Sequence, residues 1–246
     1  MSQLDQTVHW IRETNPGNIV AFTGAGISAE SGVPTFRGAS GLWKEYRAED
    51  LATPQAFTRH PEIVWEWYEW RRALIRKAQP NAAHLALAKL EASRRGRFTL
   101  VTQNVDGLHE RAGSRMIHEL HGNMFRARCV RENNRFPYPD PPPEIPPRCD
   151  CGSLLRPDVV WFGEVLPGDA FEGSAIAMQR AGLVLVVGTS AVVYPAAGLI
   201  RLATQATIVE INPEPTPLSQ SVSFSIQEKA GDAVPTIVDA LLEVGS

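Results

Sequence analysis

The sequence predicts an α/β protein built on a doubly wound parallel sheet, with a smaller part formed by two insertions. Short apolar runs rich in valine and isoleucine alternate with stretches that have helical periodicity or helix caps. Strands that are apolar throughout are typical of parallel sheets covered by helices on both faces. The expected strands are Ile19–Thr23, Phe98–Thr102, Leu183–Gly188 and Thr207–Ile211. The expected helices lie near residues 3–14, 61–78, 82–94, 171–180, 195–204 and 233–243.

Two stretches interrupt this alternation. Residues 39–80 form a long helical excursion rich in aromatic side chains, and residues 124–158 contain the run FPYPDPPPEIPPRCDCG. Prolines at this density exclude both a regular helix and a central strand. We therefore assign residues 1–38, 81–123 and 159–246 to the larger sheet domain. The two insertions, 39–80 and 124–158, are expected to build a smaller second domain.

Composition places the chain among globular proteins with a sizeable core. Its 246 residues are 43% hydrophobic and 21% charged. A formal net charge of -3 gives no electrostatic argument for a nucleic-acid partner. No apolar run approaches the ~20 residues that span a bilayer, so no membrane partner is expected. The N-terminus lacks the apolar core of a signal peptide, and three cysteines fit a reducing compartment, so we expect a cytoplasmic location.

A glycine-rich turn follows the first expected strand, in the order Gly24-Ala25-Gly26 with a small residue at Ala29. The spacing G-x-G-x-x-A is that of a dinucleotide-binding turn. We expect Gly24 to adopt a backbone angle closed to other residues, and Gly26 to let the main chain approach a pyrophosphate. Ala29 would let a helix pack closely on the strand, with N–H groups at its start facing the phosphates. Alone, the pattern also fits an ordinary strand-to-helix turn.

Polar residues surround this turn. Residues 31–38 end the helix early with glycine and proline and continue as a polar loop, where a dehydrogenase would continue its helix. Polar side chains also follow three expected strands, at the edge of the sheet where ligands of this architecture bind. Each alone is an ordinary turn residue, but the set indicates a ligand site. The set comprises Gln103, Asn104, Asp106, Thr189, Ser190, Asn212 and Glu214.

Several longer motifs occur in a fixed order, namely GAGISAESGVPTFRG, TQNVDGLH, HELHGN, RPDVVWFGE and GTS. This series resembles that of the sirtuins, the NAD-dependent protein deacylases, from about Ile19 to the C-terminal helix. The resemblance implies a Rossmann-like large domain and a small domain that combines helices with a zinc ribbon. It also implies a cleft that holds NAD and an acylated lysine of a protein. In that family NAD is cleaved rather than reduced.

The resemblance assigns the catalytic roles to His121 and Asn104. An imidazole can accept a proton near neutral pH. The family reaction implies that nicotinamide leaves the ribose as the acyl oxygen attacks, after which His121 helps a ribose hydroxyl to attack the imidate. Asn104 and Asp106 match positions that hold the ribose, a water and the nicotinamide carboxamide. The other cofactor contacts that the resemblance implies are Gly24, Ala25, Gly26, Ile27, Phe36, Arg37, Gln103, Gly188, Thr189, Ser190, Asn212, Glu214 and Ala233.

The remaining histidines give no comparable signal. The run His118-Glu119-Leu120-His121 is one residue short of the H-E-x-x-H zinc motif, so a catalytic metal is not expected there. His118 is interpreted as structural. His84 and His109 are interpreted as ordinary surface or core histidines.

Tyr68 and Arg71 are the candidates for acyl selectivity. They lie three residues apart, on one face of the helix expected after Pro61. Without context, the segment would be an aromatic core stripe with a solvated arginine pair. In context, Tyr-x-x-Arg matches the sirtuin branch that removes succinyl and malonyl groups, in which a phenol and a guanidinium hold the distal carboxylate. A small residue near Ala52 is also a feature of that branch and would leave a wider acyl pocket.

The segment that follows Arg156 is expected to bind the substrate peptide. A short strand with exposed backbone groups can pair with an extended peptide and leave alternate side chains to line a channel. Val160 and Phe162 are the candidates for lining the acyl-lysine channel. An ordinary half-buried strand is the alternative interpretation.

The zinc ligands depart from the family pattern, which has two C-x-x-C pairs. Here Cys129 is followed three residues later by Glu132, and the second pair is the shorter Cys149-Asp150-Cys151. Three thiolates remain, with Glu132 or Asp150 as a candidate oxygen ligand. A weak zinc site and a lost zinc site both remain open.

The leading functional hypothesis is NAD-dependent removal of succinyl, malonyl and also acetyl groups from protein lysines, releasing nicotinamide and O-acyl-ADP-ribose. A protein ADP-ribosyltransferase on the same fold is one alternative. A non-catalytic NAD-binding module is another, although the presence of His121, Asn104 and Asp106 argues against it. An oxidoreductase is remote, because nothing in the sequence requires hydride transfer.

Overall fold

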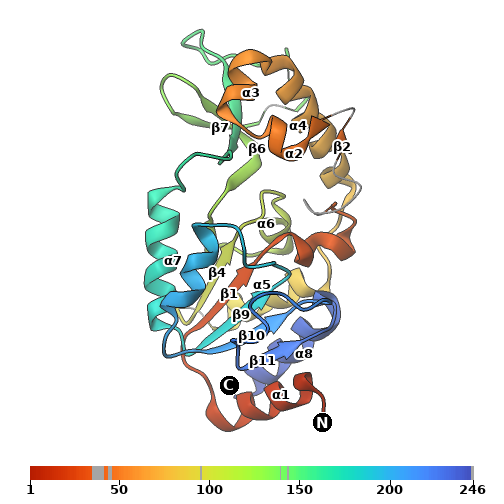
Figure 1. Cartoon of the computed structure of the whole chain (residues 1–246), viewed down its shortest axis with the longest axis vertical. Helices are drawn as coiled ribbons and strands as arrows, with labels where there is room; N and C mark the ends of the chain where they lie inside the picture. Colours follow the sequence, from red (N-terminus) through yellow and green to blue (C-terminus); the bar gives the residue numbers. More distant parts are fainter. Residues whose placement is uncertain (35–41, 44–45, 95, 139, 143, 245–246) are drawn as a thin grey trace.

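The computed structural model describes residues 1–34, 42–43, 46–94, 96–138, 140–142 and 144–244, with only the backbone of residues 42 and 43. A parallel sheet of six strands forms its lower part (Figure 1). The strands lie in the order β11 (Phe224–Ile226), β10 (Thr207–Ile211), β9 (Leu183–Val187), β1 (Ile19–Thr23), β4 (Phe98–Thr102) and β5 (Ile117–Glu119). The four predicted strands are the four inner members of this sheet.

Helices cover both faces of the sheet because alternate strand residues are apolar on both sides. Ile19 and Ala21 face a core shared with α1 (Gln3–Thr14), α5 (Ala82–Ser93) and α8 (Ala230–Val244). Val20 and Phe22 face the opposite core, shared with α7 (Gly168–Arg180) and the 3-10 helix η2 (Ala196–Leu202). The predicted doubly wound fold is therefore confirmed. No helix among the described residues is long and apolar enough to cross a membrane.

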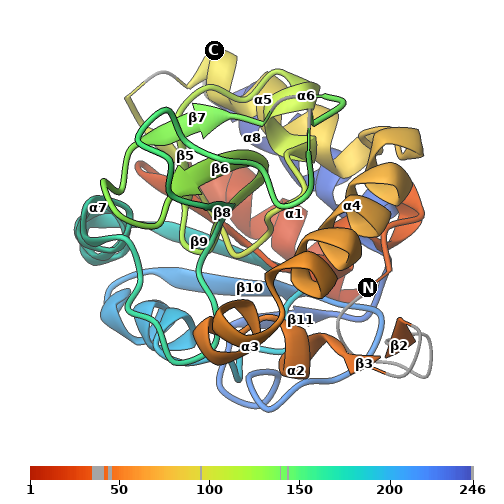
Figure 2. The ribbon, with the colours of Figure 1, turned by 90° about the horizontal axis from the view of Figure 1, so that it is seen from above.

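A smaller module lies above the carboxyl ends of the sheet strands (Figures 1 and 2). Its antiparallel sheet has the order β7 (Arg135–Pro137), β6 (Gly122–Cys129), β8 (Leu155–Val159). Beside it lie α2 (Ala48–Leu51), α3 (Pro54–Arg59) and α4 (Pro61–Lys77), together with the two-residue strands β2 (Leu42–Trp43) and β3 (Tyr46–Arg47). Side chains of α4 and of all three antiparallel strands share one hydrophobic core.

The aromatic side chains of α4 hold a buried cation. Arg72 is 0% exposed, donates a hydrogen bond to the Met124 carbonyl, and forms an ion pair with Glu69. Its guanidinium lies 3.8 Å from the ring centroid of Tyr138 and 5.0 Å from that of Trp65, within cation–π range. The alternative interpretation of a solvated arginine pair does not describe Arg72.

Candidate active site

The glycine turn after β1 is shaped by close packing rather than by backbone strain. Gly24 has an extended backbone, with φ -126° and ψ -174°, so the expected special angle is absent. A Cβ at Gly24 would lie 2.7 Å from the Cβ of Thr189, and one at Gly26 would lie 2.7 Å from the Cα of Gly188. The glycines are needed because the turn rests directly on the segment that follows β9. That segment turns at Gly188, whose φ of +60° also favours glycine.

The segment after the turn is the short 3-10 helix η1 (Ala25–Ser31) rather than an α-helix. Ala29 is exposed, so it does not pack against the strand as expected. The N–H of Gly26 donates to the carbonyl of Gly188, and the N–H of Ile27 donates to the carbonyl of Gly24. These two donors are therefore not free for a phosphate. Ile27 and Ser28 are the fully buried residues of this segment, and Ser28 is the one with a polar side chain.

The polar strand ends meet one another, as the sequence predicts. The amide nitrogen of Gln103, after β4, donates to Thr189 Oγ1 at 3.0 Å. The amide nitrogen of Asn212, after β10, donates to the Thr189 carbonyl at 3.2 Å. Thr189 lies two residues beyond the end of β9, so one residue joins the ends of three strands. Glu214 lies farther out and is exposed.

Ser28 joins two of the candidate site residues. Its hydroxyl donates to Asp106 Oδ2 at 2.7 Å and accepts from Asn104 Nδ2 at 3.2 Å. The other oxygen of Asp106 accepts from the N–H of Leu108, at the start of α6 (Leu108–Ala112). Burial raises the pKa of Asp106, and these hydrogen bonds oppose the rise. Sequence reasoning missed Ser28, because no local pattern separates it from the rest of the turn.

Two histidines lie behind Ser28. His84 Nε2 is 3.4 Å from Ser28 Oγ, and His109 Nε2 is 3.0 Å from the hydroxyl oxygen of Thr23. Their ring centroids are 4.8 Å apart. Burial lowers the pKa of His84 to about 4 and that of His109 to about 3, so both rings are neutral at pH 7. They are core histidines, but they support the candidate site, which the sequence did not indicate.

His121 occupies the turn between β5 and β6, at the junction of the two sheets. Its Nδ1 lies 2.9 Å from the Gln103 carbonyl oxygen, which can only accept, so Nδ1 carries the proton in the neutral ring. The opposite nitrogen, Nε2, is then the basic atom. Burial lowers the pKa of His121, and the bond to Gln103 opposes this shift. His121 is thus a neutral base at physiological pH.

The segment after β8 ties His121 to the helical module. The N–H of Val160 donates to the His121 carbonyl at 2.9 Å, and the N–H of Phe162 donates to the Ala52 carbonyl at 2.9 Å. Between them, the N–H of Trp161 donates to a carboxylate oxygen of Glu164. These donors are used within the protein, so pairing with a peptide would rest on the carbonyls of the segment. Phe162 is 52% exposed and Trp161 is 2% exposed, so neighbouring side chains of this segment differ sharply in burial.

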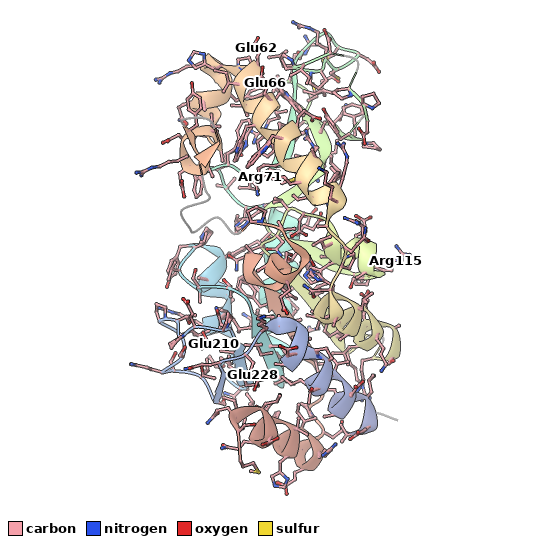
Figure 3. The ribbon with its side chains drawn as sticks, turned by 90° about the vertical axis from the view of Figure 1, so that its right-hand side faces the viewer. Glu62, Glu66, Arg71, Arg115, Glu210 and Glu228 are labelled. Carbon is pink, nitrogen blue, oxygen red and sulfur yellow. The ribbon has the colours of Figure 1, made fainter. Side chains whose placement is uncertain are left out.

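Arg71 lies at the lower end of the small module (Figure 3), on the same helix as Tyr68. Tyr68 is 1% exposed, and its hydroxyl accepts a hydrogen bond from Trp161 Nε1 at 3.0 Å. Burial lowers the pKa of Arg71, while electrostatic interactions with Tyr68 and Asp106 raise it. The guanidinium thus interacts with both the phenol and a carboxylate of the sheet domain. It also lies 5.0 Å from the ring centroid of Trp67.

The sequence model of the Sir2 family matches residues 24–195, more than half of the chain. The chain belongs to the Sir2 family. The NAD-dependent protein deacylase of Aquifex aeolicus is 54% identical over 230 residues, which cover 92% of this chain and 96% of that protein. A Sir2 homologue solved as an NAD complex has a TM-score of 0.88 at 48% identity, covering 98% of this chain and 95% of that one. A Sir2 structure with a p53 peptide and NAD+ has a TM-score of 0.82 at 32% identity, covering 97% of each chain.

Membership of the Sir2 family confirms the resemblance read from the motifs. The individual NAD contacts stay predictions. Ala25 and Ser190 are partly exposed, whereas Ile27 and Ala233 are fully buried in the core. Phe36 and Arg37 lie outside the described residues.

The cysteines form a cluster at the far end of the small module. Cys129, Cys149, Cys151 and Glu132 each place one ligand atom within 4.8 Å of the others. The sulfurs of Cys129 and Cys151 are 3.5 Å apart, close to the about 3.8 Å that two thiolates would span on a tetrahedral zinc ion. Three thiolates and a carboxylate therefore fit a structural metal ion. Asp150, the other candidate oxygen ligand, is not part of this cluster.

Proposed function

We propose that this Sir2 protein removes acyl groups from protein lysines with NAD as co-substrate and prefers acyl groups that end in a carboxylate, such as succinyl and malonyl. NAD-dependent protein deacylation is the activity of its named relatives. The preference rests on one observation, the placement of Arg71 on the same helix as the buried Tyr68 phenol, with which its guanidinium interacts electrostatically. Acetyl-lysine is expected to be a substrate as well.

In this proposal the described residues have distinct tasks. Asn104 and Asp106, fixed by Ser28, hold the ribose and nicotinamide end of NAD. The acyl oxygen bonds to the ribose carbon as the bond to nicotinamide breaks. His121 Nε2 then accepts a proton from a ribose hydroxyl, and the hydroxyl attacks the imidate carbon. A water molecule then adds to this carbon as its bond to the lysine nitrogen breaks, so the products are nicotinamide, the free lysine and O-acyl-ADP-ribose.

The preference follows from the chemistry of the two side chains. A guanidinium and a phenol can both donate hydrogen bonds to a carboxylate. A charge-assisted bond of this kind contributes about 1.5–3 kcal/mol, which corresponds to about 10- to 100-fold in selectivity. Acetyl has no distal oxygen to accept these bonds, so it gains nothing from them. Ala52, whose carbonyl accepts from the N–H of Phe162, has a small side chain and leaves room for the longer acyl chain.

The test is a panel of acetyl-, malonyl- and succinyl-lysine peptides assayed with NAD. Arg71→Met should lower kcat/KM for succinyl-lysine by about 10- to 100-fold and have a much smaller effect on acetyl-lysine. Arg76→Met is a matched control, because Arg76 lies on the same helix but pairs with exposed Asp140 on the outer side. Equal losses on the two substrates in Arg71→Met would contradict the preference. Transfer of labelled ADP-ribose to protein would instead indicate an ADP-ribosyltransferase.

We also propose that the cysteine cluster holds a structural zinc ion with Glu132 as the fourth ligand. The ion would join the β6–β7 turn, which carries Cys129 and Glu132, to the loop before β8, which carries the other two thiolates. Thiolate and carboxylate donors in fourfold coordination suit zinc. The described geometry favours Glu132 over Asp150.

A further inference from the structure

The hydrogen bond between Trp161 and Tyr68 fixes the direction of the Tyr68 hydroxyl proton. Trp161 Nε1 lies 3.0 Å from the Tyr68 hydroxyl oxygen. An indole nitrogen can only donate, so the phenol oxygen must be the acceptor in this bond. The proton of the phenol then points away from Trp161 and remains available to another acceptor. Both side chains are at most 2% exposed, so water does not compete for this geometry.

Trp161 is itself held in place on several sides. The Arg156 guanidinium lies 3.4 Å from the centroid of the indole ring, and the ring of Phe57 packs at 5.2 Å. Glu164 accepts from both terminal nitrogens of Arg156 and from the backbone N–H of Trp161. Arg156 also donates to the Val159 carbonyl. The indole therefore has one orientation, set by a clasp of Arg156 and Glu164.

The charges around Tyr68 favour a negatively charged acceptor for its proton. The guanidiniums of Arg71, Arg156 and Arg72 act electrostatically on the phenol. Burial nevertheless keeps the pKa of Tyr68 above its ordinary value, so the hydroxyl stays protonated at neutral pH and remains a donor.

We propose that Trp161 is a positioning residue for acyl selectivity: its indole N–H orients the Tyr68 hydroxyl so that the phenol proton meets the distal carboxylate of the acyl group. The inference rests on the proposed preference for acidic acyl groups. Trp161 lies between Val160 and Phe162, the candidate wall of the acyl-lysine channel. The segment 160–162 would therefore line the channel and also orient the phenol that donates to the acyl group at the end of the channel.

The central variant is Trp161→Phe, which keeps an aromatic ring between Phe57 and Arg156 but removes the N–H. We expect KM for a succinyl-lysine peptide to rise about 3- to 10-fold, the size of one neutral hydrogen bond, with kcat changing less than KM. The acetyl-lysine KM should change less, because that substrate does not use Tyr68. In a double variant with Tyr68→Phe, Trp161→Phe should not lower the ratio of kcat/KM for succinyl-lysine to kcat/KM for acetyl-lysine any further.

Trp65→Phe is the matched control. Trp65 is equally buried in the same core, and its Nε1 donates to the Leu155 carbonyl at 2.9 Å rather than to Tyr68. Trp65→Phe should lower the free energy of unfolding without changing the ratio of kcat/KM for succinyl-lysine to kcat/KM for acetyl-lysine. A purely structural role for Trp161 predicts the same behaviour in both variants. Should Trp161→Phe fail to fold, Glu164→Gln, which loosens the clasp, should lower the ratio in the same direction.

The outcomes separate this inference from the proposed function. If Arg71→Met and Tyr68→Phe lower the succinyl-to-acetyl ratio but Trp161→Phe does not, the positioning role is wrong and the acyl preference stands. The positioning role is also wrong if Trp65→Phe lowers the ratio as much as Trp161→Phe does. If neither Arg71→Met nor Tyr68→Phe changes the ratio, the acyl preference and the positioning role both fail.

Discussion

His121 Nδ1 donates a hydrogen bond to the carbonyl oxygen of Gln103 at 2.9 Å, and this single bond selects the tautomer of the candidate base. Gln103 is itself held by Thr189, so the orientation of the imidazole depends on the junction of β4 and β9. The carbonyl of His121 accepts from the N–H of Val160, so this bond also fixes the segment after β8 relative to His121. His121, the candidate base, and Val160, a candidate for the channel wall, are thus positioned by one set of backbone and side-chain hydrogen bonds.

The pH dependence of activity should follow the lowered pKa of His121. Burial places this pKa below its ordinary value of 6.5, so the neutral base persists as the pH falls through 6.5. We expect kcat/KM to decline only when the pH falls below the lowered pKa of His121. A profile of kcat/KM between about pH 5 and 8, with stability checked at each point, measures this. An acid limb centred at or above 6.5 would contradict the assignment.

The free energy of unfolding should fall as the pH drops below 6.5, because His84 and His109 are buried as neutral rings. Their pKa values are about 4 and about 3 in the folded state, against 6.5 for an unperturbed histidine. Between these values the unfolded chain binds protons that the folded chain does not. Each histidine should thus contribute a slope of about 1.4 kcal/mol per pH unit. Urea unfolding at several pH values measures this slope. In His109→Gln the slope should be smaller by the contribution of about one proton.

Replacing Ser28 by alanine should impair NAD use more than it impairs folding. The change removes the donor to Asp106 and the acceptor of Asn104, two residues expected to hold the nicotinamide end of NAD. A fall in kcat/KM for NAD of about tenfold or more is expected, as for one lost charge-assisted bond. Ser31→Ala is the control, because Ser31 lies on the same segment and accepts a bond from Asn81, whereas Ser28 accepts from Asn104 and donates to Asp106. Similar losses in both variants would argue against a role for Ser28 in the site.

The core of the fold could be predicted because its strands are buried on both faces. Leu183–Val187 is apolar at every position, and alternate residues enter the two cores. The edge strands β5 and β11 were missed because they are three residues long and both contain polar residues. The 3-10 form of η1 and η2 was also missed, since apolar spacing cannot distinguish such short helices from α-helices.

The candidate site could be predicted only where its residues belong to local motifs. His121 and the polar strand ends come from runs that the sequence presents intact. Ser28, His84 and His109 meet through the tertiary fold, over separations of tens of residues, and no local pattern connects them. The purpose of Gly24 was misjudged for a related reason. A glycine pattern does not reveal whether the residue serves a backbone angle or a close contact.

The identity of the fourth metal ligand leads to the last prediction. Glu132 lies beside three thiolates, so Glu132→Cys should restore a set of four and raise zinc affinity, because zinc favours soft thiolate ligands. Glu132→Gln should weaken binding by about 10- to 100-fold, since a neutral amide oxygen replaces a carboxylate. Asp150→Asn is the control, because Asp150 is outside the cluster. Competition with a chromophoric chelator gives the affinities, and zinc content after dialysis gives the stoichiometry. If the unmodified protein retains no zinc and Glu132→Cys gains none, the cluster is a packed thiol group and not a metal site.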